Sequence, residues 1–296
     1  MQALADHRWF DPRSAYEKTI HFNIGSTGWM VLSRSGIPDT FVKISEFPGA
    51  LADEALRYAA ASATYGSLTP HLKGYRQLPQ GDILVSQAVD ADGLSPLAFQ
   101  GGRHAAQVMS GLDRYFAAMA RSELPASLPT LTNSVLIPTL REYYAAHPQS
   151  VLIQRHLSDV MHCHCLALPN LPQHGDLVLN NLALAQGELI VFDWEDFGRI
   201  QLPGLDLYTV LMSLGLGGPE VRAHSAKANS VWRRLVQGGC PPLNISIDQL
   251  GAMKGVYLLA FRYLKRNYGP DIGQRMDRLI AEYAPTWDWA PAPSGA

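Results

Sequence analysis

Two carboxylates and an amide lie within one short stretch of this chain. His174–Asp176 is followed by Asn181, and an apolar run then ends at Asp193. A short strand, a turn at Gly187 and a second short strand would bring Asp193 back beside Asn181. Carboxylate and amide oxygens suit a hard cation such as Mg²⁺, which is usually shared with substrate phosphates. The pattern predicts phosphoryl transfer, with Asp176 near an acceptor hydroxyl and with Asn181 and Asp193 on the metal.

The two halves of this stretch also resemble a known family. The pattern is HGD, four residues and N, followed by an apolar strand that ends in DWE. It is similar to the catalytic and metal-binding segments of the aminoglycoside phosphotransferases and choline kinases, which are small-molecule kinases with a protein-kinase-like fold. The resemblance implies an α+β chain of two lobes, a small antiparallel β-rich amino-terminal lobe and a larger, mainly helical carboxyl-terminal lobe. It also implies an enzyme that needs Mg²⁺ and moves the γ-phosphate of ATP or GTP to a hydroxyl of a small molecule.

The amino-terminal part contains a glycine hairpin and then a strand with a single lysine. Strand-type residues flank Asn23–Gly28, and Phe41–Ile44 surrounds Lys43. Glycine lets backbone N–H groups approach anionic oxygens closely. In the resembled family such a hairpin covers the nucleotide phosphates, and a strand lysine pairs with them and with a helix glutamate. A lone lysine in a strand can also be an edge or solvent-facing residue.

Glu54 is the best candidate for the glutamate that would pair with Lys43. It lies on a helix predicted at about residues 50–65, and the next glutamate after it is Glu123. An acidic residue is also favoured in a first helical turn for its own sake. Farther along, a strand predicted at residues 82–88 leads into a hinge whose backbone would contact the base. The candidate nucleotide-binding residues are Asn23, Gly25, Ser26, Thr27, Gly28, Lys43, Glu54, Gln87 and Val89.

The pattern changes from alternating strands to helical stripes near Gly93. Apolar residues then recur at helical spacing along most of the chain. Helices are predicted at residues 96–121, 134–145, 151–165, 219–236, 247–268 and 272–283. We therefore divide the chain into a nucleotide-covering lobe, residues 1–92, and a catalytic and acceptor-binding lobe, residues 93–296.

Three smaller features of this second part have more than one interpretation. Asp206 resembles an aspartate that braces the catalytic loop in the family, or it caps the start of a helix. The cluster of Arg262, Lys265 and Arg266 is interpreted as solvated charge at a helix end. The run His162–Cys165 could suggest zinc, but a tetrahedral site needs a second pair of ligands, and no matching motif is present.

Composition restricts the classes of function. The 296 residues are 47% hydrophobic and 17% charged, with a formal net charge of −2, so we expect a globular chain that does not bind nucleic acid. No apolar run reaches membrane-spanning length and the amino terminus lacks a signal-peptide core, so no membrane partner is expected and the cytoplasm is the expected location. Three cysteines fit a reducing compartment. The expected partners are a nucleotide and a small-molecule acceptor, bound by a monomer or homodimer.

Other functions are compatible with parts of this pattern. A nucleotide-binding pseudokinase would act as a regulatory or scaffold module, but such chains usually lose one of Lys43, Asp176, Asn181 and Asp193, which are all present here. A protein kinase proper would carry HRD, DFG and APE elements instead of HGD and DWE. Either aspartate alone could be a turn residue. The residues directly after Asp176 lack the His-Pro-Gly common in the group and any nearby cation, so the acceptor is not identified.

Overall fold

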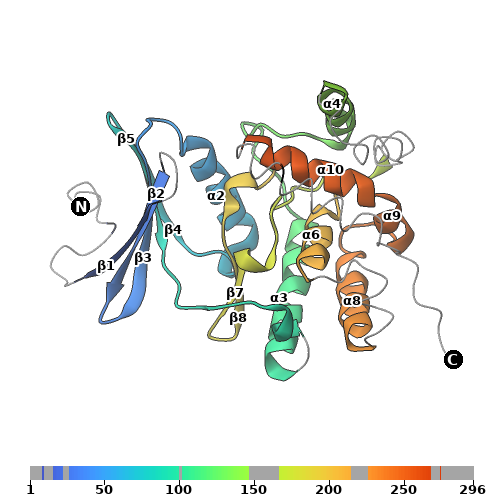
Figure 1. Cartoon of the computed structure of the whole chain (residues 1–296), viewed down its shortest axis with the longest axis horizontal. Helices are drawn as coiled ribbons and strands as arrows, with labels where there is room; N and C mark the ends of the chain where they lie inside the picture. The colour runs from blue at the N-terminus through green and yellow to red at the C-terminus, as the bar shows by residue number, and fades with distance from the viewer. Residues whose placement is uncertain are drawn as a thin grey trace.

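The computed structural model describes residues 9, 16–22, 27–99, 102–146, 167–214, 226–267 and 274. This part of the chain forms a five-stranded sheet with one long helix, and a larger group of helices around a three-stranded sheet. Figure 1 shows the five-stranded sheet on one side, the larger helical group on the other, and helix α2 (Ala52–Tyr65) between them. The predicted α+β class with two lobes is confirmed, whereas the boundary near residue 92 stays a prediction.

The amino-terminal sheet is antiparallel and places Lys43 at its centre. Its strands are β1 (Glu17–Phe22), β2 (Thr27–Arg34), β3 (Ile37–Ser45), β4 (Leu72–Leu78) and β5 (Gly81–Gln87). They are ordered β1-β2-β3-β5-β4, so β3 is the middle strand. Lys43 on β3 lies opposite Trp29 on one side and Leu84 on the other. It is therefore not an edge residue, and its amine needs a partner inside the lobe.

Helix α2 connects the sheet to the rest of the molecule. Its sequence is rich in alanine, which favours helix, and Ala55, Tyr58, Ala61 and Tyr65 form its buried face at three- and four-residue intervals. The first backbone N–H groups of a helix have no partner within the helix. Here the fully buried Asp82 of β5 accepts hydrogen bonds from the N–H groups of residues 49 and 51, at 2.9 Å and 2.8 Å. This contact fixes the start of α2, the turn that carries Glu54.

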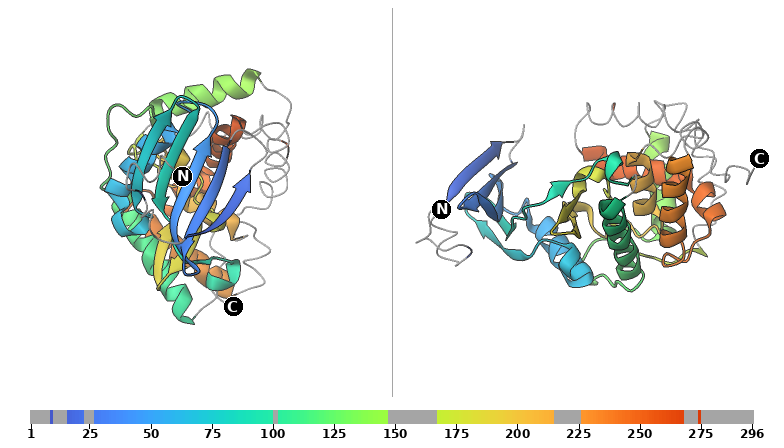
Figure 2. Two further views of the ribbon diagram at one scale, coloured as in Figure 1. Left: turned by 90° about the vertical axis from the view of Figure 1, so that its left-hand side faces the viewer. Right: turned by 90° about the horizontal axis from the view of Figure 1, so that it is seen from below.

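The carboxyl-terminal lobe surrounds the predicted catalytic stretch with helices. The helices are α3 (Gly102–Met119), α4 (Asn133–Ala146), α6 (Leu205–Ser213), α8 (Ala226–Gly239), α9 (Ile247–Ala252) and α10 (Lys254–Leu264). Strands β6 (Asp92–Gly93), β7 (Leu182–Ala185) and β8 (Glu188–Val191) form the small sheet. The right-hand view in Figure 2 shows this lobe as the longer part of the molecule, and within it α10 packs against α6. Nearly every side chain of α6 is buried, so the helix next to the catalytic stretch is part of the core.

Several predicted helices differ from the observed ones. The helix predicted at residues 247–268 is two helices, α9 and α10, which meet at Met253, and Gly251 just before this point lowers the helix propensity. The helix predicted at 96–121 is a short 3-10 turn, Pro96–Phe99, followed by α3. The helix predicted at 151–165 and the start of the one at 219–236 lie outside the described residues, as does all but Gln274 of the one at 272–283. In the described part, no helix combines the length and the hydropathy needed to cross a bilayer.

Candidate active site

The carboxylate of Asp206 holds the start of the predicted catalytic stretch, residues 174–193, in place by hydrogen bonds. This carboxylate is fully buried and accepts hydrogen bonds from the backbone N–H groups of His174 (2.7 Å) and Gly175 (2.9 Å) and from the hydroxyl of Tyr115 (2.7 Å). Helix α6 begins after Gly204 without a side-chain cap. The bracing interpretation of Asp206 is therefore confirmed, and the N-cap interpretation is wrong. Burial raises the pKa of Asp206, and its hydrogen-bond donors act in the opposite direction.

His174 is a structural member of this loop. Its ring is buried, with Nε2 at 2.7 Å from the carbonyl of Phe192 and the ring centroid 4.7 Å from that of Trp194. Its Nδ1 accepts the backbone N–H of Asp176 at 3.2 Å, so Nε2 carries the proton and donates to Phe192. Both ring nitrogens thus bind the protein. His174 joins the loop that carries Asp176 to the strand that precedes Asp193.

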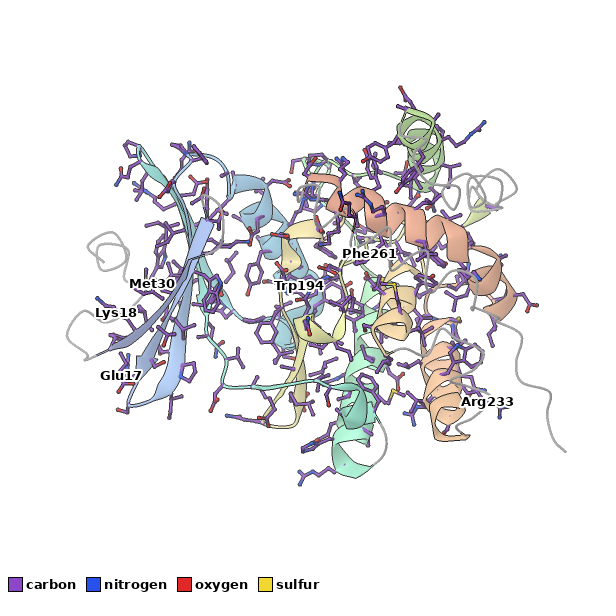
Figure 3. The ribbon with its side chains drawn as sticks, viewed as in Figure 1. Glu17, Lys18, Met30, Trp194, Arg233 and Phe261 are labelled. Carbon is purple, nitrogen blue, oxygen red and sulfur yellow. The ribbon has the colours of Figure 1, made fainter. Side chains whose placement is uncertain are left out.

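Trp194 forms the centre of an aromatic cluster at the junction of the two lobes. Its ring packs against Tyr65 of α2 at a centroid distance of 5.0 Å and against Phe197 at 5.6 Å, and its Nε1 donates to the carbonyl of Val191 at 2.9 Å. Figure 3 shows Trp194 near the middle of the molecule, among side chains of α2 and α3. Aromatic packing of this kind therefore fixes the segment that follows Asp193.

The predicted hairpin brings Asp193 beside Asn181. Strands β7 and β8 pair through a turn at Gln186-Gly187, and the N–H of Phe192 donates to the carbonyl of Asn181 at 2.9 Å. The side-chain Nδ2 of Asn181 donates to the backbone carbonyl of Asp176 at 2.8 Å. This bond leaves the Oδ1 atom of Asn181 as the one suited to a cation.

Asp193 has an unusual backbone and an unusual electrostatic environment. Its dihedral angles, φ 61° and ψ 62°, lie in the left-handed region that residues other than glycine rarely adopt and that is enriched at functional sites. The residue is exposed to the cleft between the lobes, and the walls of the cleft keep part of the water away from its carboxylate. This desolvation, together with the negative charge of Glu195, raises the pKa of Asp193 to about 7, against the lowering effect of Lys43.

Lys43 reaches across the cleft to carboxylates from both lobes. Its Nζ lies 3.0 Å and 2.8 Å from the two carboxylate oxygens of Glu54, and 3.2 Å from Oε2 of Glu195. Burial lowers the pKa of Lys43, but the charges of Glu54, Glu195 and Asp193 outweigh it and raise the pKa above its ordinary value. Burial raises the pKa of Glu54 to about 7, although Lys43 lowers it. The structure therefore brings Lys43 and Glu54 together, as the sequence predicts.

A cavity of about 480 Å³ opens between the lobes at this point. Lys43, Glu54 and Asp193 line its polar end, and the remaining wall is mainly apolar, with Trp29, Val31, Phe41, Tyr58, Leu84, Gln87, Ala88, Val89, Phe192 and Trp194. The N–H of Gln87 donates to the carbonyl of His71 (2.8 Å), and the N–H of Ala88 donates to that of Asp39 (3.1 Å). The N–H groups of Gln87 and Ala88, the first two residues of the predicted hinge, are thus already hydrogen-bonded. Val89 is the next hinge residue that lines the cavity, where a planar ligand in the apolar end would contact it.

The structure places the other predicted residues less fully. Asn23, Gly25 and Ser26 of the glycine hairpin lie outside the described residues. Thr27 and Gly28 begin β2, opposite Ser45 and Ile44 of β3, and neither is among the residues that line the cavity. The run at residues 162–165 also lies outside the described part.

One cation beside Asp176, that of Lys265, was not predicted from the sequence. Lys265, interpreted above as solvated charge, is buried, and its Nζ lies 2.9 Å from Oδ2 of Asp176 and 3.0 Å from Oδ2 of Asp196. The solvated interpretation is wrong for Lys265, because the end of α10 packs directly against the catalytic stretch. The local pattern contains no signal for this contact, since the partners lie far apart in the sequence and the neighbouring arginines resemble a surface cluster.

The oxygen donors of the cleft fit Mg²⁺ better than a transition metal. Within the described residues, no three His, Cys, Asp or Glu side chains form a group that could hold a metal by themselves. Mg²⁺ usually keeps several waters and takes only one or two protein carboxylates together with substrate phosphates, so Asn181 and Asp193 are a sufficient protein set. Near them the ammonium of Lys43 faces three carboxylates, those of Glu54, Asp193 and Glu195. A divalent cation would reduce this excess of negative charge.

Comparison with known proteins supports the same fold. No family model and no curated protein sequence matches the chain. An amicoumacin kinase in complex with AMP-PNP and Ca²⁺ is similar in structure, with a TM-score of 0.63 and 14% identity over 95% of this chain and 92% of that one. A macrolide 2′-phosphotransferase from Brachybacterium faecium gives 0.62 and 11% identity, covering 97% of both chains. A choline/ethanolamine kinase family protein from Mesorhizobium loti gives 0.59 and 13%, covering 99% and 95%.

This chain has the fold of these small-molecule kinases. The resemblance predicted from HGD and DWE is confirmed at the level of the fold. The sequence identities are low, so these similarities show the fold and not the activity.

Proposed function

We propose that the protein is a Mg²⁺-dependent kinase that transfers the γ-phosphate of ATP or GTP to a hydroxyl of a small molecule. The observation that carries the proposal is that Lys43 and Glu54 line one interlobe cavity together with Asp193, whose neighbours are Asn181 and Asp176, although the two groups lie far apart in the sequence. A nucleoside triphosphate donor also fits the cytoplasmic location predicted from the sequence. The amicoumacin kinase of the same fold was solved with AMP-PNP, which supports a nucleotide in this cleft.

The cleft has an apolar end that suits a nucleotide base and a polar end that suits its phosphates. Its apolar part would hold the base, with the backbone of Gln87 and Val89 at the hinge. Lys43, held by Glu54, would contact the phosphates, and Asn181 and Asp193 would hold Mg²⁺. A bound metal would supply positive charge that neutralises the phosphates.

In this proposal Asp176 acts in the transfer step. The acceptor oxygen forms a bond to the γ-phosphorus, the bond from that phosphorus to the β–γ bridging oxygen breaks, and the nucleoside diphosphate leaves with the electron pair. The hydroxyl proton passes to the carboxylate of Asp176. Catalysis of this kind is positioning and electrostatic stabilisation more than covalent chemistry, so the fixed loop around Asp176 matters as much as the carboxylate itself.

Two substitutions test the assignment of roles. Asp176→Asn should leave Mg²⁺-dependent nucleotide binding nearly unchanged and lower turnover by roughly 10²–10⁴-fold, the usual contribution of general-base assistance. Asp193→Asn should weaken Mg²⁺-dependent nucleotide binding as well as turnover. Asp248→Asn, on the exposed first turn of α9, is the matched control and should change neither.

The measurements are calorimetry with and without Mg²⁺, and nucleoside diphosphate release over a panel of amino alcohols, aminoglycosides and sugars. Wild-type protein that binds nucleotide but phosphorylates no acceptor would favour the pseudokinase alternative. Wild-type protein that binds neither ATP nor GTP would refute the kinase proposal.

A further inference from the structure

Lys265 is the buried cation closest to the proposed catalytic aspartate. It follows α10 directly and points under the catalytic loop, where its Nζ lies 2.9 Å from Oδ2 of Asp176. The same nitrogen lies 3.0 Å from Oδ2 of Asp196, the residue that follows the DWE motif. The Lys265 side chain is only 9% exposed, against 19% for Asp176 and 4% for Asp196. The ammonium of Lys265 thus forms ion pairs with both the buried Asp196 and the proposed catalytic Asp176.

Lys265 stays protonated although its side chain is buried. Burying an ammonium is costly unless it is paired and hydrogen-bonded. Burial lowers the pKa of Lys265, but the charges of Asp176 and Asp196 outweigh it and raise the pKa above its ordinary value. Asp196 also has a second partner, because Nε of Arg199 lies 3.2 Å from its Oδ1. Asp196 therefore has two cationic partners, Arg199 and Lys265. The ion pair with Oδ2 of Asp176 is made by Lys265.

The approach of α10 to the loop depends on a glycine. Gly175 has φ +86°, and a Cβ added there would lie 3.0 Å from Cδ1 of Leu264 and 3.1 Å from Cβ of Asp196. A side chain at this position would separate the loop from both elements. Gly175, Leu264 and Asp196 therefore bring three segments into one contact, and Lys265 and Asp176 meet at its edge.

We propose that Lys265 is a positioning residue for phosphoryl transfer. Its charge-assisted hydrogen bond holds Oδ2 of Asp176 and so directs the other carboxylate oxygen toward the acceptor hydroxyl. It also supplies, from a distant helix, the cation that is missing from the residues directly after Asp176. The inference rests on the proposed kinase function and adds a residue to its machinery.

The test compares removal of the charge with its conservation. Lys265→Met should lower kcat by about 10²-fold, the scale of a misplaced catalytic group, while the KM for ATP changes less than threefold. Lys265→Arg should keep at least a tenth of the wild-type kcat. Arg233→Met, on the exposed side of α8, is the control and should leave kcat unchanged. Turnover is measured as ADP release with the best acceptor of the panel and with water alone, and folding is checked by thermal melting.

A double variant separates positioning from simple charge balance. In Asp196→Asn/Lys265→Met the buried carboxylate and its cation are removed together, so the chain should fold. If Lys265 positions Asp176, kcat of this double variant stays low while Asp196→Asn alone stays near wild type. Recovery of wild-type kcat in the double variant, or a Lys265→Met kcat within threefold of wild type, would overturn the proposal. Wild-type protein without any acceptor-dependent turnover would instead refute the kinase function, and the role of Lys265 with it.

Discussion

The Asp206→Asn substitution tests whether the brace beneath the catalytic loop has the importance that its geometry indicates. Oδ2 of Asp206 accepts from the N–H of His174 and the hydroxyl of Tyr115, and Oδ1 accepts from the N–H of Gly175. An amide of the same shape has one acceptor oxygen and one NH₂ group. Either orientation of the amide therefore turns its NH₂ toward a backbone N–H that has lost its acceptor.

The expected cost follows from this count. One buried charge-assisted hydrogen bond is lost and two donors face each other, which amounts to roughly 2–4 kcal/mol of unfolding free energy. Because the loop also carries Asp176, we expect kcat to fall by about 10²-fold through misplacement. Nucleotide binding should change little, since none of these groups lines the cavity.

Urea unfolding and steady-state kinetics of Asp206→Asn provide the measurement, with Asp248→Asn as the exposed control, expected within about 0.5 kcal/mol of wild type. If Asp206→Asn is as stable as that control, the bracing argument is refuted. If it is destabilised while kcat stays at the wild-type value, the brace supports the fold but does not position the aspartate.

Two further predictions concern the metal site and the junction of the lobes. Mg²⁺ binds the carboxylate form of Asp193, and the pKa of this residue is raised to about 7. The Mg²⁺ affinity should therefore reach its maximum above pH 8 and fall about tenfold per pH unit below pH 7. Calorimetry of MgADP binding from pH 8 to 5.5 checks this, and a flat profile would contradict it. Arg57→Met should cost about 2–4 kcal/mol of unfolding free energy, because the buried guanidinium donates to the carbonyls of Phe197 and Pro129 at 2.8 Å; a urea midpoint equal to that of wild type would show that these bonds contribute nothing.

The parts of the site that sequence reasoning predicts are those specified by nearby residues. Asn181 and Asp193 are joined by one short hairpin, so strand period and a glycine turn suffice to bring them together. Glu54 follows Lys43 after one turn and is the first glutamate on the next helix. The conformation of Asp193 is not predictable in this way, because a left-handed backbone is uncommon in residues other than glycine and no local pattern marks it here.

The parts that could not be predicted depend on packing between distant segments. No local pattern shows that the hinge N–H groups of Gln87 and Ala88 are already bound to His71 and Asp39. These bonds follow from the positions of β3 and β4 relative to β5, which only the assembled sheet defines. Lys265 is the same kind of case, because a lysine beside arginines at a helix end has the same sequence appearance whether the helix faces solvent or the core.

The contact of Lys265 with Asp176 is the last link of a longer chain of ion pairs. From α2, Asp53 contacts Arg199 at 2.9 Å, Arg199 contacts Asp196 at 3.2 Å, and Asp196 contacts Lys265, which holds Asp176. Opposite charges alternate along this chain of ion pairs. The pair of Lys265 and Asp196 is buried and costly to break, whereas Arg199 and Asp53 are 38% and 40% exposed, so their pair contributes little. Helix α2, which supplies Glu54 as the partner of Lys43, is thereby linked to Asp176. In the proposed kinase, α2 is thus connected to both the nucleotide side and the acceptor side, and the exposed Asp53–Arg199 pair is the weaker link.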